Sequence, residues 1–589
     1  MPVRSAPRPM ALAPLLSLVA LLQVAAPADT GWRVDHDVVV PMRDGVSLRA
    51  DLYRPREGRA FPVLVYRTPY DKREVVIDYT TVQHAVARGY AVLVQDVRGR
   101  YASDGTFEAY RQEGRDGYDT IEWAAVQPWS TGAIGMFGLS YPAAVQWLAA
   151  MESPPHLKAI VPAMSFASPR QFFYSGGAFD LSWASWTWMN IAPDLRVKLG
   201  VPGPRTYAGA DSSWEREEAR VLAQRPLLDL PDFKGIAPWY YEWMRHEPTD
   251  PWWDWAELTG RYHRTSAAVL NLSGWHDEAY GPNGATRNFT GLVAARGAAT
   301  ARTAMRIGPW VHGVDATART RSGEREFGPS AAIDYDEVVL RWLDHHVRGI
   351  DNGVDREPPV RVFVMGANRW RDASTWPLPG MAAETLWFAP SGALTARAPA
   401  TPRAASSFVS DPDDPVRDPF DARYGAHDFR ALAARNDLLT FETAPLTESL
   451  EVIGSITVEL HLQTDARDVD VYVKLLDVAP DGTAYNLMSP GLELLRASYR
   501  EPERGRQLLE PGRTYVLRLG ELITANEFAA GHRIRVQVMG AFQPHFSLNL
   551  QTGAHENTSA VAQRARITIH HDRAHPSRIV LPVRPRDGR

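Results

Sequence analysis

Residues 133–150 read Ala-Ile-Gly-Met-Phe-Gly-Leu-Ser-Tyr-Pro-Ala-Ala-Val-Gln-Trp-Leu-Ala-Ala, a short apolar strand that runs directly into an apolar helix. A sharp turn between such elements lifts the hydroxyl of Ser140 above the strand end, and small neighbours let the backbone make it. The free N–H groups at the helix start then face a reacting carbonyl oxygen. Pro142 replaces the last Gly of the G-x-S-x-G pattern. Proline is tolerated at this position because it falls in the first turn of the helix, where a backbone N–H would have no partner. This context predicts that Ser140 is a nucleophile.

The flanking sequence alternates between strands and helices. After a hairpin at 32–53, continuous apolar strands are expected at 61–66, 91–95, 133–137, 157–161, 267–272 and 305–307, with helices at 113–127, 142–150 and 332–348. Uninterrupted apolar strands alternating with helices indicate a parallel sheet that is covered on both faces. Together with the turn at Ser140, the alternation predicts an α/β class protein with an α/β-hydrolase fold.

Two departures from this alternation divide the chain. Residues 166–261 are helix-like, loop-rich and crowded with Trp and Tyr, which predicts a helical cap inserted between catalytic segments 29–165 and 262–352. Most of these tryptophans are expected to pack inside the cap, with some left to line an apolar substrate pocket. From 353 to 589, short alternating runs separated by turns predict an all-β jelly-roll domain. These runs include 360–364, 456–460, 469–473, 515–519, 534–538 and 567–569.

Composition excludes several classes of function. A net charge of −5 leaves no basic excess to neutralise phosphates, so nucleic acid is not an expected partner. The absence of cysteine excludes disulfides, thiol catalysis and iron–sulfur clusters. No H-E-x-x-H motif or comparable His/Asp spacing supports a metallohydrolase, and no metal or organic cofactor is expected.

The first 28 residues have the organisation of a secretory signal peptide. Arg4 and Arg8 precede an apolar run at 10–22, and Ala26-Pro-Ala28 supplies small residues for cleavage. The alternative is a membrane anchor, which Pro14 and the cleavage site disfavour. We therefore expect an exported protein, periplasmic or secreted, that begins near Asp29 and has no stable membrane anchor.

A serine nucleophile needs a base, and the base needs an acid that orients it. In α/β hydrolases these follow in the order Ser, Asp or Glu, His, each after a strand. Asp277 follows the strand at 267–272, and His312 follows the strand at 305–307. Glu278 is the alternative acid. Weaker rivals for the base are His276, which is adjacent to Asp277, and His345 and His346, which lie on a later helix.

Five ordered motifs resemble the cocaine esterase-like (CocE/NonD) hydrolases, relatives of the X-Pro dipeptidyl-peptidases and α-amino acid ester hydrolases. They are Arg67-Thr-Pro-Tyr70, Asp96-Val-Arg-Gly-Arg-Tyr-Ala-Ser-Asp-Gly105, Gly138-Leu-Ser-Tyr141, Gly274-Trp-His-Asp277 and Gly308-Pro-Trp-Val-His312. The resemblance spans about residues 33–585. It implies Ser140 as nucleophile, Asp277 as acid and His312 as base, with an oxyanion hole made by the Tyr70 hydroxyl and the Tyr141 N–H. The Asp96–Asp104 segment is interpreted as structural.

The resemblance leaves the substrate open. A small-molecule ester or amide is expected, and a peptide remains an alternative partner, because an X-Pro dipeptidyl-peptidase or another amidase would use the same residues. Relatives that recognise an ammonium group carry further acids after the catalytic Asp. Here Ala279 and Tyr280 follow Glu278, which argues against an amine-bearing substrate. A different class, a surface-binding protein that works through its jelly roll, is disfavoured by the intact set of catalytic residues. Oligomeric state is not predicted.

Overall fold

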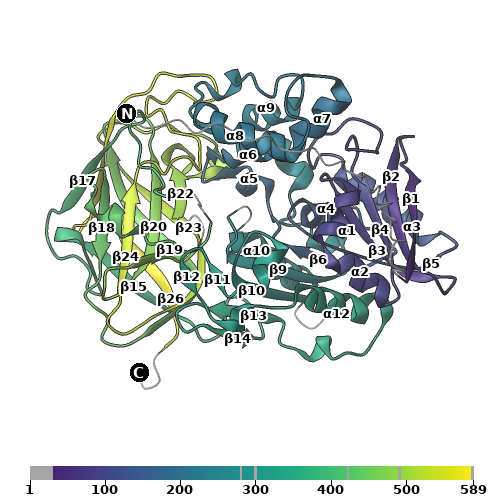
Figure 1. Ribbon diagram of the computed structural model, residues 1–589. Coiled ribbons are helices and arrows are strands. Elements are labelled where there is room, and N and C mark those ends of the chain that lie inside the picture. The colour runs from purple at the N-terminus through teal and green to yellow at the C-terminus, as the bar shows by residue number, and fades with distance from the viewer. Residues whose placement is uncertain (1–30, 279–280, 298–301, 421–423, 489–491, 586–589) are drawn as a thin grey trace, which may run out of the picture.

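The computed structural model describes residues 31–278, 281–297, 302–420, 424–488 and 492–585. The predicted signal peptide, residues 1–28, lies outside them. Within the described part of the chain, no helix is both long and apolar enough to span a bilayer. Figure 1 shows a mixed α/β region on the right, a region of strands on the left, and a group of helices above both.

The α/β region is built on one sheet, called here the N-terminal sheet. Its spatial order is β1-β2-β4-β3-β5-β6-β9-β10-β13-β14. The strands are β1 (Trp32–Pro41), β2 (Ser47–Pro55), β3 (Phe61–Thr68), β4 (Ala91–Asp96), β5 (Ser130–Leu139), β6 (Leu157–Ala163), β9 (Ala268–His276), β10 (Thr303–Val311), β13 (Val360–Val364) and β14 (Arg369–Ala373). From β4 to β13 all neighbours are parallel. This is the predicted α/β-hydrolase arrangement.

Helices cover both faces of this sheet. They are α1 (Lys72–Asp78), α2 (Thr80–Ala87), α3 (Glu113–Ala125), α4 (Tyr141–Met151), α10 (Gly281–Arg296) and α12 (Tyr335–Arg348). Ile121 and Ala144, from α3 and α4, share a buried cluster with Val63 of β3. On the opposite face, Leu343 of α12 packs with Leu64 of the same strand. Alternate residues of a strand point to opposite faces, so each apolar run fills two cores.

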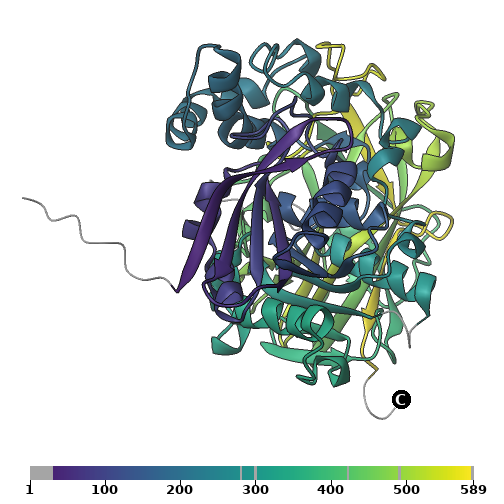
Figure 2. The same cartoon turned by 90° about the vertical axis from the view of Figure 1, so that its right-hand side faces the viewer.

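The insertion after β6 forms the predicted helical cap. Its elements are α5 (Pro169–Phe172), β7 (Tyr174–Ser175), β8 (Ala178–Phe179), α6 (Ser182–Trp186), the π-helical turn η1 (Thr187–Ile191), α7 (Ala192–Leu199), α8 (Tyr207–Leu222), η2 (Leu227–Asp229), α9 (Pro238–Arg245), η3 (Pro251–Ala256) and η4 (Tyr262–Arg264). Turned by 90°, the molecule again shows these helices above the N-terminal sheet (Figure 2). Three tryptophans of the cap, Trp239, Trp243 and Trp253, are buried in its core.

The C-terminal region is a β structure, called here the C-terminal sheet, in which all strand pairs but β16–β18 are antiparallel. It contains β15 (Ala382–Ala389), β16 (Ala393–Thr395), β17 (Ala405–Ser410), β18 (Leu438–Glu442), β19 (Leu450–Thr464), β20 (Asp470–Val478), β21 (Ala484–Asn486), β22 (Leu492–Arg496), β23 (Thr514–Phe528), β24 (Arg533–Met539), β25 (Ala565–His570) and β26 (Arg578–Val583). Its core is lined by Val452, Val458, Val536 and Ile567, all fully buried. The predicted all-β domain is confirmed.

One strand belongs to a different sheet than the sequence pattern predicts. The alternation in Val360–Val364 favours the C-terminal sheet, but this strand, β13, pairs in parallel with β10 and carries β14 with it. Its neighbour in the chain, Met365, then bonds to Ala525 and Glu527 of β23. Alternating apolar residues fit either sheet, so the period alone could not assign the strand.

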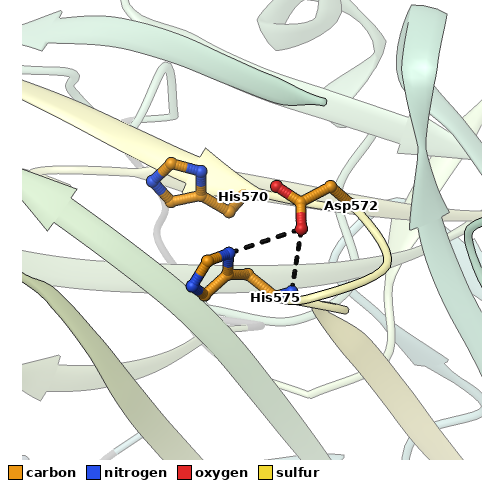
Figure 3. Close-up of side chains that lie close together, drawn as sticks. All are labelled: His570, Asp572 and His575. Carbon is orange, nitrogen blue, oxygen red and sulfur yellow. Dashed lines mark hydrogen bonds and ion pairs between the residues drawn. The ribbon is translucent and has the colours of Figure 1, made fainter. Parts of the chain in front are cut away.

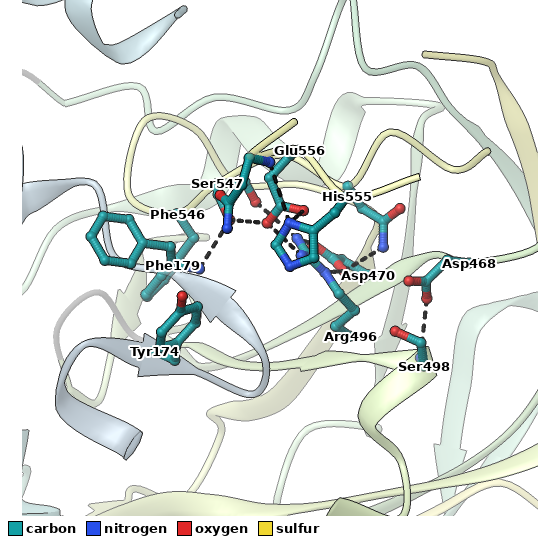
Figure 4. Close-up of polar contacts among 12 residues, drawn as sticks. Tyr174, Phe179, Asp468, Asp470, Arg496, Ser498, Phe546, Ser547, His555 and Glu556 are labelled. Atoms are coloured by element: carbon teal, nitrogen blue, oxygen red, sulfur yellow. Dashed lines mark hydrogen bonds and ion pairs between the residues drawn. The ribbon is translucent and has the colours of Figure 1, made fainter. Parts of the chain in front are cut away.

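A buried polar network fastens the cap to the C-terminal sheet (Figure 4). The Arg496 guanidinium, fully buried, bonds to the carboxylates of Asp470 and Glu556. The Ser547 hydroxyl donates to Glu556 over 2.8 Å and accepts the backbone N–H of Phe179 in the cap over 2.9 Å. Buried charges are tolerated when they are paired in this way.

Candidate active site

Ser140 occupies the strained turn that the sequence predicts. It has φ 70° and ψ −129°, between the end of β5 and the first residue of α4. Left-handed backbone is costly for a residue with a Cβ and persists where surrounding structure enforces it. A Cβ on Gly138 would lie 2.6 Å from the Cβ of Pro142, so only glycine allows this close approach. Pro142 is accommodated in the first turn of α4.

Asp277 and His312 meet at the carboxyl ends of neighbouring parallel strands, β9 and β10. The His312 Nδ1 lies 2.8 Å from the Asp277 Oδ1, and the carboxylate is completely buried. Burial lowers the pKa of His312, but the charge of Asp277 and the hydrogen bond to it outweigh that effect and raise the pKa above its usual value. An aspartate so placed fixes the ring and stabilises its protonated form.

Glu278, the alternative acid, takes a different position. Its Oε2 accepts the backbone N–H of His312 over 3.4 Å, whereas the ring nitrogen bonds to Asp277. Among the rivals for the base, His276 is fully buried and burial lowers its pKa to about 3. His345 and His346 lie on α12, where the His345 Nδ1 bonds to the Ile350 carbonyl.

The Tyr70 ring packs edge-on against the ring of Tyr141 at 6.4 Å, next to Ser140, whose hydroxyl is one of the groups that lower the pKa of Tyr70. The Trp186 indole N–H of the cap donates to the Tyr70 hydroxyl over 3.0 Å. Burial raises the pKa of Tyr70 far above its usual value. The phenol therefore keeps its proton and can donate to an oxygen that develops negative charge.

Two arginines from the sequence motifs hold the surroundings of Tyr70 and Tyr141 in place. Arg67, completely buried, contacts the Glu113 carboxylate over 2.7 Å, and the Tyr141 hydroxyl donates to that carboxylate over 2.8 Å. Arg100 donates to the carbonyls of Pro69 and of η1 in the cap. The contacts of Arg100 agree with the structural interpretation of the Asp96–Asp104 segment. The contact of Arg67 with Glu113 could not be predicted from the sequence, in which Arg67 is marked only by its motif.

Ser140, Glu278 and His312 line one cavity of about 400 Å³. Its other walls are mainly aromatic and come from distant parts of the chain. They include Tyr110 of the loop before α3, Phe172, Trp183, Trp186 and Trp214 of the cap, and Tyr424, His545 and Phe546 on the side of the C-terminal sheet. The sequence could not identify Tyr424, His545 and Phe546 as cavity residues. They follow His312 by more than 100 residues, and no local pattern shows that such loop residues fold back onto the site.

Comparisons with known proteins cover most of the chain. A family model described as X-Pro dipeptidyl-peptidase (S15 family) matches residues 44–314, and one described as X-Pro dipeptidyl-peptidase C-terminal non-catalytic domain matches residues 352–580. A cocaine esterase from Rhodococcus sp. (strain MB1 Bresler) is 33% identical over 590 residues, with 94% of this chain and 99% of the relative covered. A protein of Mycobacterium bovis described as a serine esterase is 26% identical over 622 residues, covering 92% and 94%.

Solved structures agree with these relatives. An α-amino acid ester hydrolase has a TM-score of 0.82 at 25% identity and covers 97% of this chain and 100% of its own. An aminopeptidase from a marine sediment archaeon has the same fold, with a TM-score of 0.81 at 22% identity, over 97% of this chain and 99% of its own. The chain is thus a serine hydrolase and belongs to the cocaine esterase-like (CocE/NonD) family.

Proposed function

We propose that this enzyme hydrolyses an ester or amide by acyl transfer through Ser140, with His312 as base and Asp277 as orienting acid. The observation that carries the proposal is the 2.8 Å contact between His312 and Asp277 at a cavity that also exposes Ser140 in its strained turn. A serine hydroxyl is a weak nucleophile unless a base takes its proton.

The proposed reaction has two halves. The Ser140 Oγ attacks the carbonyl carbon while its proton passes to the His312 ring, whose positive charge the Asp277 carboxylate stabilises. The Tyr70 hydroxyl and the Tyr141 N–H donate to the oxyanion. His312 then gives the proton to the leaving alcohol or amine as its bond breaks, and an acyl-enzyme remains. Water, deprotonated by His312, then attacks the acyl carbon. As the bond from that carbon to the Ser140 Oγ breaks, His312 returns the proton to Oγ, which releases the acid and restores the enzyme.

Labelling with a fluorophosphonate tests the nucleophile. We expect wild type to be labelled once, and Ser140→Ala to lose the label and to lose turnover by about 10³-fold or more. Ser185, which lines the same cavity, provides the control, and Ser185→Ala should keep both the labelling and the turnover of wild type. Labelling that survives Ser140→Ala would overturn the assignment.

The aromatic walls favour an ester with an apolar acyl or aryl group. A second candidate is cleavage of an amine-bearing substrate such as an Xaa-Pro amide, because the structure places two carboxyl groups, those of Asp180 and Glu278, in the cavity. Parallel assays with aryl esters and Xaa-Pro anilides separate the two. The family resemblance includes members of both kinds.

Export, with cleavage after Ala28, is proposed from the sequence of residues 1–28 alone. N-terminal sequencing of protein recovered from outside the cytoplasm tests it.

A further inference from the structure

Three histidines and an aspartate, none of which lines the cavity, converge on the C-terminal sheet. His461 of β19 lies directly opposite His570 of β25 in the antiparallel register, so both side chains leave the sheet on the same face. The turn that follows β25 brings Asp572 and His575 back toward His570 (Figure 3). The His575 ring centroid lies 5.3 Å from that of His570 and 5.7 Å from that of His461.

Backbone hydrogen bonds hold this turn in its conformation. The Asp572 Oδ1 accepts the N–H groups of Ala574 and His575 over 2.8 and 2.9 Å. The Ser577 hydroxyl donates to the His570 carbonyl over 2.6 Å and accepts the His461 N–H over 2.9 Å. The turn is thus tied to both strands, which fixes the backbone from which the four side chains project.

The spacing of the possible donor atoms suits a small cation. One donor atom from each of His570, Asp572 and His575 lies within 4.8 Å of the other two, a grouping that stands alone among the described residues. The buried Nδ1 of His575 makes no hydrogen bond and lies 3.3 Å from the Asp572 carboxylate. Two ligands bound at the 2.0–2.1 Å typical of zinc are about 3.4 Å apart in a tetrahedron. His461 lies outside this group of three, with its ring centroid 5.7 Å from that of His575, and would join it as a fourth ligand by turning its ring toward His575.

We propose that His461, His570, Asp572 and His575 form a binding site for a divalent transition metal ion, with Zn²⁺ as the best match. Three imidazole nitrogens and one carboxylate oxygen are typical donors for zinc and unsuited to Mg²⁺ or Ca²⁺, which prefer oxygen. The bound ion would join β19, β25 and the turn that precedes β26. In a chain with no cysteine, it would serve as a cross-link within the C-terminal sheet.

The test uses the full-length protein without a polyhistidine tag, stripped with a chelator and dialysed. Isothermal titration with Zn²⁺ should show one equivalent per chain, and Co²⁺ should produce the strong visible absorption of a tetrahedral site. The His570→Asn/His575→Asn variant should bind Zn²⁺ at least tenfold more weakly. His345→Asn, on α12, is the matched control and should bind as wild type does. Zn²⁺ should raise the melting temperature of wild type and of the control only.

Equal Zn²⁺ binding by wild type and the double variant would overturn the proposal, as would the absence of binding to wild type. If the double variant fails to fold, His461→Gln replaces it, since this residue lies on β19 outside the turn. It should also bind at least tenfold more weakly. Octahedral Co²⁺ absorption, or tighter binding of Mg²⁺ than of Zn²⁺, would likewise refute a nitrogen-rich site.

Discussion

At the scale of single residues, Glu278 adds a second carboxyl group beside the proposed base. It accepts the backbone N–H of His312 and faces the cavity that Ser140 lines. Burial, against the opposing charge of His312, raises the pKa of Glu278 to about 7. Its ionised form in turn raises the pKa of His312, after the larger effects of burial and Asp277. The protonation of each group therefore depends on that of the other.

We expect Glu278→Gln to move the acid limb of the kcat/KM profile to lower pH, by up to about one pH unit. A base must be neutral to act, so activity rises as pH passes upward through the pKa of His312. Removing the nearby negative charge destabilises protonated His312 and lowers that pKa. The measurement is kcat/KM for an aryl ester from pH 5 to 9.

Asp180→Asn is the matched control for this profile. Asp180 lines the same cavity, and burial raises its pKa to about 6, but Asp180 does not influence the pKa of His312 in the way Glu278 does. Its removal should leave the acid limb in place. A loss of turnover of about 10⁴-fold in Glu278→Gln, with near-normal turnover in Asp277→Asn, would instead make Glu278 the orienting acid.

At the scale of elements, Arg67 joins the end of β3 to the starts of α3 and α4. Its guanidinium contacts the Glu113 carboxylate of α3, which accepts the hydroxyl of Tyr141, the first residue of α4. The N–H of Tyr141 is one of the two proposed donors to the oxyanion. The Arg-Thr-Pro-Tyr motif thus supports both donors, one through Tyr70 and one through Glu113.

Arg67→Met should destabilise the enzyme by about 3–5 kcal/mol, because it leaves a buried carboxylate without its cation. The free energy of unfolding in urea at pH 7 measures the loss. Adding Glu113→Gln should recover much of it, since a neutral amide can still accept the Tyr141 hydroxyl. A double variant as unstable as Arg67→Met would show that Arg67 acts through packing alone.

How much the sequence predicts depends on how local each feature is. Ser140 can be predicted as the nucleophile because strand, turn and helix are contiguous. Asp277 and His312 can be predicted as its partners because parallel strands end at one edge of a sheet. The sheet to which β13 belongs and the approach of Phe546 to the cavity both depend on contacts between distant segments. No periodicity encodes such contacts, and Val360–Val364 reads equally well in either sheet.

At the scale of the whole molecule, the network around Arg496 connects the cap to the C-terminal sheet and carries a dependence on pH. Burial alone would raise the pKa of Glu556, but Arg496 outweighs it and lowers that pKa to about 2. An acid whose folded-state pKa is lowered stabilises the protein above its unfolded value of 4.5, and this stabilisation is lost as pH falls from about 4.5 to 2.

Glu556→Gln should therefore lower the free energy of unfolding by about 3 kcal/mol at pH 7 and flatten its decline between about pH 4.5 and 2. Acid unfolding followed by circular dichroism provides the measurement. Glu501→Gln, in an exposed ion pair with Arg504, is the control and should unfold as wild type does. An unchanged acid transition in Glu556→Gln would assign the stabilisation to other groups.

The position of β13 and β14 has a consequence for how this enzyme can be recombined. A chimaera of this chain and a relative that is joined at residue 352, the apparent linker, would take most of the N-terminal sheet from one parent. The last two strands of that sheet, β13 and β14, would come from the other parent. The strand that must pair with them is β10, which ends just before His312. If the foreign strands fit β10 poorly, its edge is left unpaired, and an unpaired sheet edge is prone to association with other chains. A crossover placed after Ala373 keeps that sheet from one parent. The unit that can be inherited intact is longer than the linker suggests, and it includes a part of the chain that lies beside β23.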